Sequence, residues 1–190
     1  MTVLAGLDIA TTTGITVLDG GRLVFAQPFK WEGKCSGEIF RHFRSTFYRL
    51  IEKYRIEQVA AEEPLRTDIE LKGKPNEDGT EGEKRRPTMQ TFQRIYGLCA
   101  ICEEVCAAHK VQFRYVHQGT WRKAFTGSGR ATKDDALAYA RLVDKSITSY
   151  DAAESMGVAW WLRGELNPKY AAPRGDLFEQ AIQPKERMPF

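Results

Sequence analysis

The sequence has few of the features that mark membrane-spanning or exported proteins. No apolar run reaches the roughly 20 residues that a membrane-spanning helix needs. The chain begins with strand-like sequence instead of a basic and then apolar leader. We therefore expect neither membrane insertion nor export, and a cytoplasmic location.

The chain also has no large net charge. The 28 lysines and arginines stand against 25 aspartates and glutamates, which gives a net charge of only +3. Charge over the whole chain is therefore weak support for a polyanionic partner, and local clusters have to carry that argument. The length of 190 residues and the 42% of hydrophobic residues suit one globular domain with a sizeable core.

Residues that commonly bind transition metals are scarce. The three histidines have no spacing that requires a metal: His42, His109 and His117. Of the four cysteines, the three in "CAICEEVC" could indicate zinc or an iron-sulfur centre. The same spacing also places Cys99, Cys102 and Cys106 on one face of a helix. We favour a buried helix face, because free cysteine behaves as a small hydrophobic residue in a reducing compartment.

Patterns of hydrophobic residues and turn residues predict five short strands and four helices. The turn "DGG" between the second and third strands is a strong hairpin signal. Thr132 and Asp135 have the spacing of a capping box, so a helix is expected from 133. The strands are expected at 3–8, 14–19, 22–29, 57–65 and 111–116, and the helices at 37–54, at 88–108, from 133 and from about 150.

These elements predict one domain over residues 1–163. Within it, residues 66–87 are charged, contain glycine and proline and lack an apolar period, so they are expected to form a mobile loop. Residues 164–190 are expected to form an irregular C-terminal tail.

The order of elements predicts an α/β fold with a mixed sheet. Three antiparallel strands come first, and the crossover through the helix at 37–54 makes the fourth strand parallel to a neighbour. A position beside the first strand is natural for it. That position would bring Asp8, in the first strand, next to the end of the fourth strand.

Carboxylates gather where this arrangement would bring the chain together. Asp8 interrupts a buried strand, Glu62 and Glu63 end another, and Asp151 and Glu154 share one face of a helix start. Two such charges 4 Å apart would repel by about 4 kcal/mol at an effective dielectric of 20. Bound cations would make the cluster tolerable, and carboxylate oxygens suit Mg²⁺.

Each acidic residue also has a purely structural explanation. Asp151 follows Thr148 by three residues and so has the spacing of a helix cap, and Glu154 would favour the helix N-terminus through the dipole. Glu62 and Glu63 must point to opposite faces, because side chains alternate along a strand. Asp8 has the weakest structural explanation.

Four motifs carry a resemblance to a known family. In order along the chain they are "GLDIATTTGITVL", "VAAEEPL", "GSGRATKDDALAYA" and "YDAAESMGVAWW". They resemble the successive motifs of the RuvC family of Holliday junction resolvases, in the RNase H-like superfamily, over roughly residues 3–163. The stretch from "TWRKAF" to "GSGRATK" is similar to phage-type members in particular.

The resemblance implies an RNase H-like fold, with a five-stranded mixed sheet of three antiparallel and two parallel strands flanked by helices. It also implies a structure-selective endodeoxyribonuclease that cleaves Holliday junctions or other branched DNA by two-metal-ion hydrolysis. The cofactor would be two Mg²⁺ ions, for which Mn²⁺ should substitute. Family members act as homodimers, which makes the helix at 88–108 a candidate interface, and the location would be a bacterial cell or a phage-infected host.

Family positions carry over onto this chain residue by residue. The catalytic, metal-binding acids fall on Asp8, Glu62, Asp151 and Glu154, and a basic residue that could reach the scissile phosphate falls on Lys133. The chain departs from the common pattern in having Glu at 154 and Glu63 where many members have Gln. We expect glutamate to bind Mg²⁺ through its longer arm, with a shifted metal geometry. At position 65, Leu65 replaces an aromatic residue that stacks on junction bases.

A basic cluster beside the third motif predicts contact with DNA. Backbone amides in "GSG" could approach phosphates, and the basic side chains add the charge that sequence-independent binding needs. A solvated basic loop is the alternative explanation. The predicted DNA-binding residues are Arg122, Lys123, Ser128, Arg130 and Lys133.

Two other functions remain open at this point. "GLDIATTTG" also suits the phosphate loop of an actin-like ATPase or sugar kinase, although that fold needs two such domains and 190 residues supply one. A catalytically inactive protein that binds branched DNA is the other alternative, which the presence of all four acids disfavours.

Overall fold

The computed structural model describes residues 2–64, 66–67 and 86–171. The strands are β1 (Val3–Asp8), β2 (Thr12–Asp19), β3 (Arg22–Lys30), β4 (Gln58–Glu62) and β5 (Gln112–Val116). The helices are α1 (Ser36–Tyr54), α2 (Met89–Ala108), α3 (Gln118–Thr126), α4 (Lys133–Val143) and α5 (Tyr150–Leu166), followed by a 3₁₀ turn, η1 (Pro168–Tyr170). None of the helices in the described ranges is both long and apolar enough to cross a membrane.

The five strands form one mixed sheet in the order β3-β2-β1-β4-β5. Strand β2 is antiparallel to β1 and β3, while β4 lies parallel to both β1 and β5. The predicted α/β fold, with three antiparallel strands and two parallel ones, is confirmed. So is the predicted place of β4 beside β1, with Leu7 opposite Ala61 in the register.

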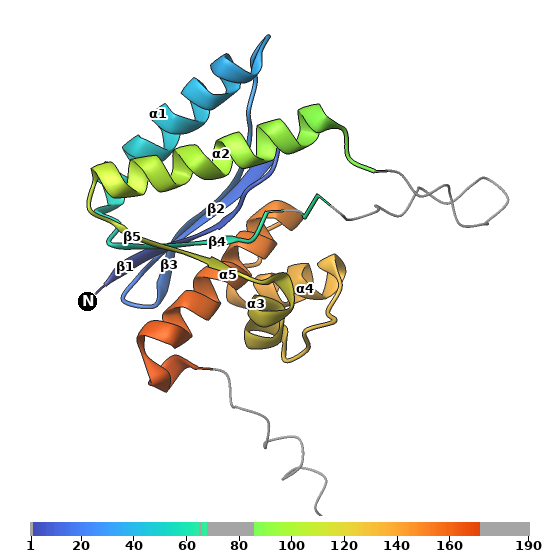
Figure 1. The fold of residues 1–190 in the computed structure, drawn as a ribbon. Coiled ribbons are helices and arrows are strands. Elements are labelled where there is room, and N and C mark those ends of the chain that lie inside the picture. Colours follow the sequence, from blue (N-terminus) through green and yellow to red (C-terminus); the bar gives the residue numbers. More distant parts are fainter. Residues whose placement is uncertain (1, 65, 68–85, 172–190) are drawn as a thin grey trace, which may run out of the picture.

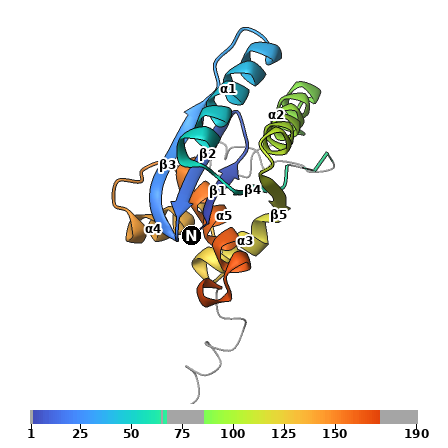
Figure 2. The same ribbon diagram turned by 90° about the vertical axis from the view of Figure 1, so that its left-hand side faces the viewer.

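Helices cover both faces of the sheet. Figures 1 and 2 show α1 and α2 on one face and α3, α4 and α5 on the other. On the first face the core contains Phe43 and Phe47 of α1 and the buried cysteines of α2. The predicted buried face of α2 is confirmed, because Cys99, Cys102 and Cys106 are free thiols inside this core.

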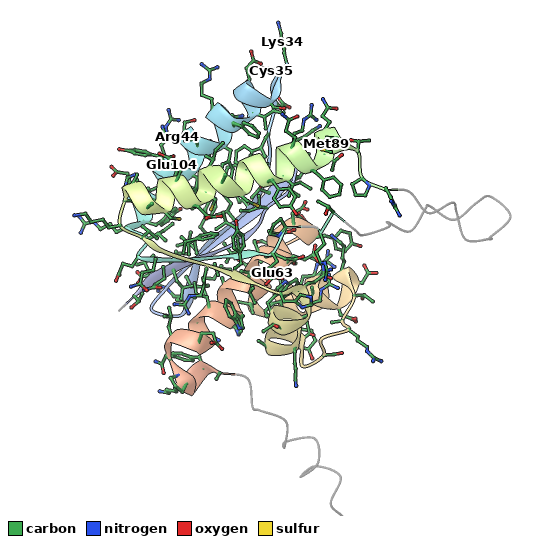
Figure 3. The ribbon with its side chains drawn as sticks, viewed as in Figure 1. Lys34, Cys35, Arg44, Glu63, Met89 and Glu104 are labelled. Carbon is green, nitrogen blue, oxygen red and sulfur yellow. The ribbon has the colours of Figure 1, made fainter. Side chains whose placement is uncertain are left out.

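Figure 3 labels two residues that join α1 and α2 at the surface, Arg44 and Glu104. Their ion pair measures 3.1 Å and both side chains are about half exposed. An exposed pair of this kind contributes little, about 0–1 kcal/mol. The buried apolar faces of α1 and α2 therefore hold this layer in place.

Helix α5 lies closest to the sheet and is the best-buried helix, with nine of its 17 residues buried. Small residues in "DAAESMGVA" allow this approach, and Ser155 bonds to the Thr16 hydroxyl of β2 at 2.9 Å. A Cβ atom on Gly14 of β2 would collide with the backbone carbonyl of Asp151. The first turn of α5 therefore sits directly on the sheet next to the end of β1.

Helix boundaries agree with the sequence except in two places. The N-cap of α5 is Ser149, whose side chain accepts from the amide of Ala152, so the cap spacing of Thr148 with Asp151 was the wrong pair. Helix α3 was not predicted, although two of its residues, Arg122 and Lys123, were predicted to bind DNA. The capping box of Thr132 with Asp135 at the start of α4 is confirmed.

Some predictions fall partly or wholly outside the described residues. Leu65, most of the expected loop at 66–87 and most of the expected tail at 164–190 lie outside the described residues. Within the described part, α5 continues to Leu166 and η1 follows it.

Candidate active site

The predicted acidic residues lie at one edge of the sheet. Asp8 ends β1 and Glu62 ends β4, and because these strands are parallel their carboxyl ends meet there. In the antiparallel pair of β1 and β2, Asp8 lies opposite Gly14. The backbone carbonyl of Asp151 packs directly against Gly14. Glu154 lies one turn further along α5. The fold thus brings Asp8, Glu62, Asp151 and Glu154 into one electrostatic environment.

Asp8 has the most unfavourable environment of the four. No hydrogen bond to its carboxylate is found among the described residues. Burial raises the pKa of Asp8 well above its usual value, and the charges of Glu62, Glu154 and Asp151 raise it further, against an opposing effect of Lys133. The positive charge of Lys133 therefore does not offset the burial and the three acidic neighbours of the Asp8 carboxylate.

Both carboxylate oxygens of Glu62 accept hydrogen bonds from α3. The indole Nε1 of Trp121 donates to Oε2 at 2.7 Å, and the side-chain amide of Gln118 donates to Oε1 at 3.1 Å. Burial raises the pKa of Glu62, the Trp121 hydrogen bond lowers it, and the charge of Glu154 raises it again. The net pKa lies above the usual value for glutamate.

Glu154 is buried between two cations. Arg122 of α3 donates to Oε1 at 2.7 Å and Lys133 of α4 donates to Oε2 at 2.6 Å. The side chain of Arg122 is only 13% exposed, whereas that of Lys133 is 58% exposed. Burial alone would lower the pKa of Lys133, but its bond to Glu154 and the charges of Glu154, Asp8 and Asp151 raise it. Lys133 therefore stays positively charged at the edge of the cluster.

Asp151 lies in the first turn of α5, where a negative charge also favours the positive end of the helix. Its Oδ2 accepts a long hydrogen bond of 3.4 Å from the hydroxyl of Ser149. This leaves Asp151, like Asp8, with a carboxylate that no cationic side chain in the described residues binds directly.

The remaining predicted DNA-binding residues are exposed, and they are close in sequence to Arg122 and Lys133 of this cluster. Lys123 lies on α3, and Ser128 and Arg130 lie in the turn that leads to α4. Two of the amides in "GSG" serve that turn, since Gly127 donates to the carbonyl of Lys123 and Ser128 donates to the hydroxyl of Thr126. Any phosphate contact here would therefore depend mainly on side chains.

The donor chemistry of the acidic cluster fits a hard divalent cation. Asp8 and Asp151 present carboxylate oxygens without a cationic hydrogen-bond donor, and positive charge is what the Asp8 site lacks. The described residues contain no group of three or more His, Cys, Asp or Glu side chains already spaced to hold a metal ion. Glu154 fits the predicted ligand role least well, because both of its oxygens bind cations.

Two residues of this site were missed from sequence, Gln118 and Trp121. Trp121 lies in the stretch "TWRKAF", which gave it no role of its own. A short helical face was available as a signal, because residues 118, 121 and 122 follow the i, i+3, i+4 pattern and Gly127 ends the helix in a left-handed conformation. Nothing in that pattern shows that the donors would meet Glu62, which is 59 residues away from Trp121.

The strand order and the helices on both faces of the sheet give this chain an RNase H-like fold. Comparison with solved structures places the chain beside RuvC of Thermus thermophilus, with a TM-score of 0.67 and 15% identity over 90% of this chain and 98% of that one. The same RuvC in complex with a Holliday junction substrate gives a TM-score of 0.70, again at 15% identity over 90% and 98% of the two chains.

The yeast mitochondrial Holliday junction resolvase Ydc2 is more distant, with a TM-score of 0.48 and 12% identity over 82% of this chain and 75% of that one. No family model and no curated protein sequence matches the chain. The likeness is therefore one of fold.

Proposed function

We propose that this chain is a divalent-metal-dependent endonuclease that cleaves Holliday junctions or other branched DNA. The observation that carries the proposal is the Asp8 carboxylate. It lies at the meeting point of β1, β4 and α5, has no hydrogen-bond partner in the described residues, and has three acidic neighbours that raise its pKa. Asp8 is partly exposed, so a cation from solution can reach this carboxylate, which no side chain among the described residues binds.

Asp8, Glu62 and Asp151 would hold the metal, with Glu154 as a fourth ligand if it shares its oxygens with Arg122 and Lys133. Bound Mg²⁺ or Mn²⁺ supplies positive charge that activates water and stabilises the phosphodiester undergoing hydrolysis. Trp121 and Gln118 hold the Glu62 carboxylate in place. Lys133, being half exposed, would turn its ammonium from Glu154 toward a substrate phosphate.

Branched DNA is proposed as the substrate because of the surface beside the cluster and the nature of the similar structures. Lys123, Ser128 and Arg130 are exposed on and after α3, and the similar RuvC structure contains a Holliday junction. A symmetric four-way junction suits a homodimer with two active sites, for which α2 stays the candidate interface.

The phosphate-loop interpretation of "GLDIATTTG" gains no support from the turn between β1 and β2. The Thr13 hydroxyl is fully buried, donates to the Ala10 carbonyl at 2.8 Å and accepts from the indole of Trp31 at 2.7 Å. These bonds commit the threonine to holding the turn.

A panel of DNA substrates tests this proposal. The protein should be incubated with a four-way junction, a Y-fork and a linear duplex of the same sequences, with Mg²⁺ or with EDTA, and ATP turnover should be measured in parallel. We expect Mg²⁺-dependent nicks in the branched substrates and none in the duplex. Equal cleavage of all three substrates would contradict the substrate class, and ATP turnover without cleavage would favour a phosphotransfer domain.

A further inference from the structure

We propose that Trp121 is a positioning residue for the Glu62 carboxylate, and that α3 holds this proposed metal ligand in one orientation. The inference rests on the proposed function, because it concerns the same acidic cluster. Its physical basis is the pair of hydrogen bonds by which Trp121 and Gln118 take both Glu62 oxygens.

The Trp121 bond is short and sheltered. The residue is fully buried, and its indole N–H can only donate, so a buried Trp needs an acceptor. Here the acceptor is a carboxylate at 2.7 Å instead of a backbone carbonyl. A hydrogen bond to an ionised acceptor is about twice as strong as a neutral one. The bond therefore restricts the Glu62 side chain to one orientation.

The indole ring is itself held rigidly between α3 and α5. Gly157 of α5 lies against it, and a Cβ atom at that position would come within 2.5 Å of two ring carbons. The guanidinium of Arg122, which binds Glu154, lies 5.3 Å from the ring centre. A fixed ring makes the N–H a fixed reference point, which a donor on a flexible side chain would not provide.

Such support matters for a residue at the end of a strand. Glu62 is the last residue of β4, so the sheet holds its backbone but leaves the side chain free to rotate. Groups that orient a metal ligand through hydrogen bonds typically change metal affinity or activity about 10- to 100-fold when they are removed. We expect an effect of this size for the indole N–H.

Trp121→Phe removes the N–H donor and keeps an aromatic ring at the position. Its matched control is Trp160→Phe. Trp160 lies in the same layer, but its ring packs against Arg163, whose guanidinium carbon lies 3.8 Å from the ring centre. Gln118→Ala is a second variant, at an exposed position where loss of folding is not expected. Mn²⁺ affinity should be measured from the electron paramagnetic resonance of free Mn²⁺, together with kcat and KM for junction cleavage.

Trp121→Phe should weaken Mn²⁺ binding about 10- to 100-fold, raise the metal concentration needed for half-maximal kcat, and leave KM for DNA unchanged. Gln118→Ala should show a smaller loss in the same direction, and Trp160→Phe should match the wild type. A folded Trp121→Phe variant with wild-type Mn²⁺ affinity would overturn the inference, and so would an equal loss in Trp160→Phe.

The indole N–H resonance of Trp121 tests the bond in the wild-type fold, even where Trp121→Phe does not fold. Glu62→Gln replaces a charged acceptor by a neutral one, so this resonance should move upfield while the other indole resonances stay in place. An unmoved resonance would overturn the inference. Wild-type protein that binds no Mn²⁺ would instead contradict the proposed function, and the two failures can therefore be told apart.

Discussion

At the scale of single residues, the acidic cluster divides into carboxylates that the protein neutralises and carboxylates that it does not. Glu154 has two cationic partners and Glu62 has two neutral donors. Asp8 and Asp151 have no cationic partner among the described residues. Because the other three carboxylates raise the pKa of Asp8, a bound divalent cation should stabilise the cluster.

Replacing Asp8 by Asn should stabilise the metal-free protein at neutral pH. The raised pKa of Asp8 means that the folded state binds this proton more tightly than the unfolded state does. Stability is therefore lost as pH rises from the unfolded pKa, about 3.9, through the folded pKa. The gain from Asp8→Asn should be about 1.4 kcal/mol for each unit of pKa shift.

Thermal unfolding in EDTA across a pH series measures this effect. The Asp8→Asn variant should melt at a higher temperature than the wild type at pH 7, and the two curves should converge below about pH 4. Added Mg²⁺ should stabilise the wild type and have little effect on the variant. A variant that is less stable than the wild type at pH 7 would contradict the unpaired state of Asp8.

The two cations that bind Glu154 should differ in their contribution to stability. Removing one partner of a buried ion pair costs about 3–5 kcal/mol, because the other charge stays buried, and Arg122 is the buried partner. Lys133 is largely exposed, so its contribution should be below about 1 kcal/mol. Urea unfolding of Arg122→Met and Lys133→Met compares them directly, and equal losses would contradict this division of roles.

At the scale of elements, the site depends on how closely α5 lies against the sheet and on α3 beside it. Strands β1 and β4 could be predicted from short apolar runs, and α5 from a longer run of small and apolar residues. Helix α3 escaped prediction because it is nine residues long, carries basic residues and ends in a glycine-rich turn. Its contacts to Glu62 and Glu154 come from tertiary packing, which no local pattern of residues contains.

Gly14→Ala should separate α5 from the sheet and disrupt the site. The new Cβ would collide with the Asp151 carbonyl, so the first turn of α5 has to move away from Asp8. Overpacking of this kind costs about 1–3 kcal/mol, and sometimes more, and we expect Mn²⁺ affinity to fall with it. Thermal unfolding and Mn²⁺ titration measure the two effects.

Gly37→Ala in α1 is the matched control for this change. Its new Cβ would meet only the Cys35 sulfur, at 3.9 Å, so it should leave metal affinity unchanged and slightly stabilise the helix. Wild-type Mn²⁺ affinity in Gly14→Ala would show that the position of α5 does not determine the site.

At the scale of the whole molecule, the two faces of the sheet have different roles. An apolar core lies on each face, under α1 and α2 on one and under α3, α4 and α5 on the other (Figure 1). The second layer also supplies Asp151, Glu154 and the two cations that bind Glu154. The order of β3, β2, β1 and β4 could be predicted from the sequence because it follows from short connections and right-handed crossovers. The pairing of Glu154 with Arg122 could not, since it depends on where α3 packs against α5.

Binding of branched DNA should depend steeply on salt through the exposed cations beside the site. Each phosphate neutralised changes log K by about 0.9 per unit of log salt concentration. The double variant Lys123→Gln with Arg130→Gln should therefore lower the slope by about 1.8. Arg41→Gln with Arg49→Gln, on exposed positions of α1, is the matched control, and an equal fall in slope there would contradict the assignment of the DNA surface.

The central claim is that Asp8 belongs to a metal site that cleaves branched DNA. Single-turnover cleavage of a saturating four-way junction, measured against Mg²⁺ concentration for the wild type and Asp8→Asn, tests it most directly. We predict Mg²⁺-dependent cleavage by the wild type, and loss of cleavage with junction binding retained in Asp8→Asn. Cleavage by Asp8→Asn at the wild-type rate and Mg²⁺ dependence would contradict the account.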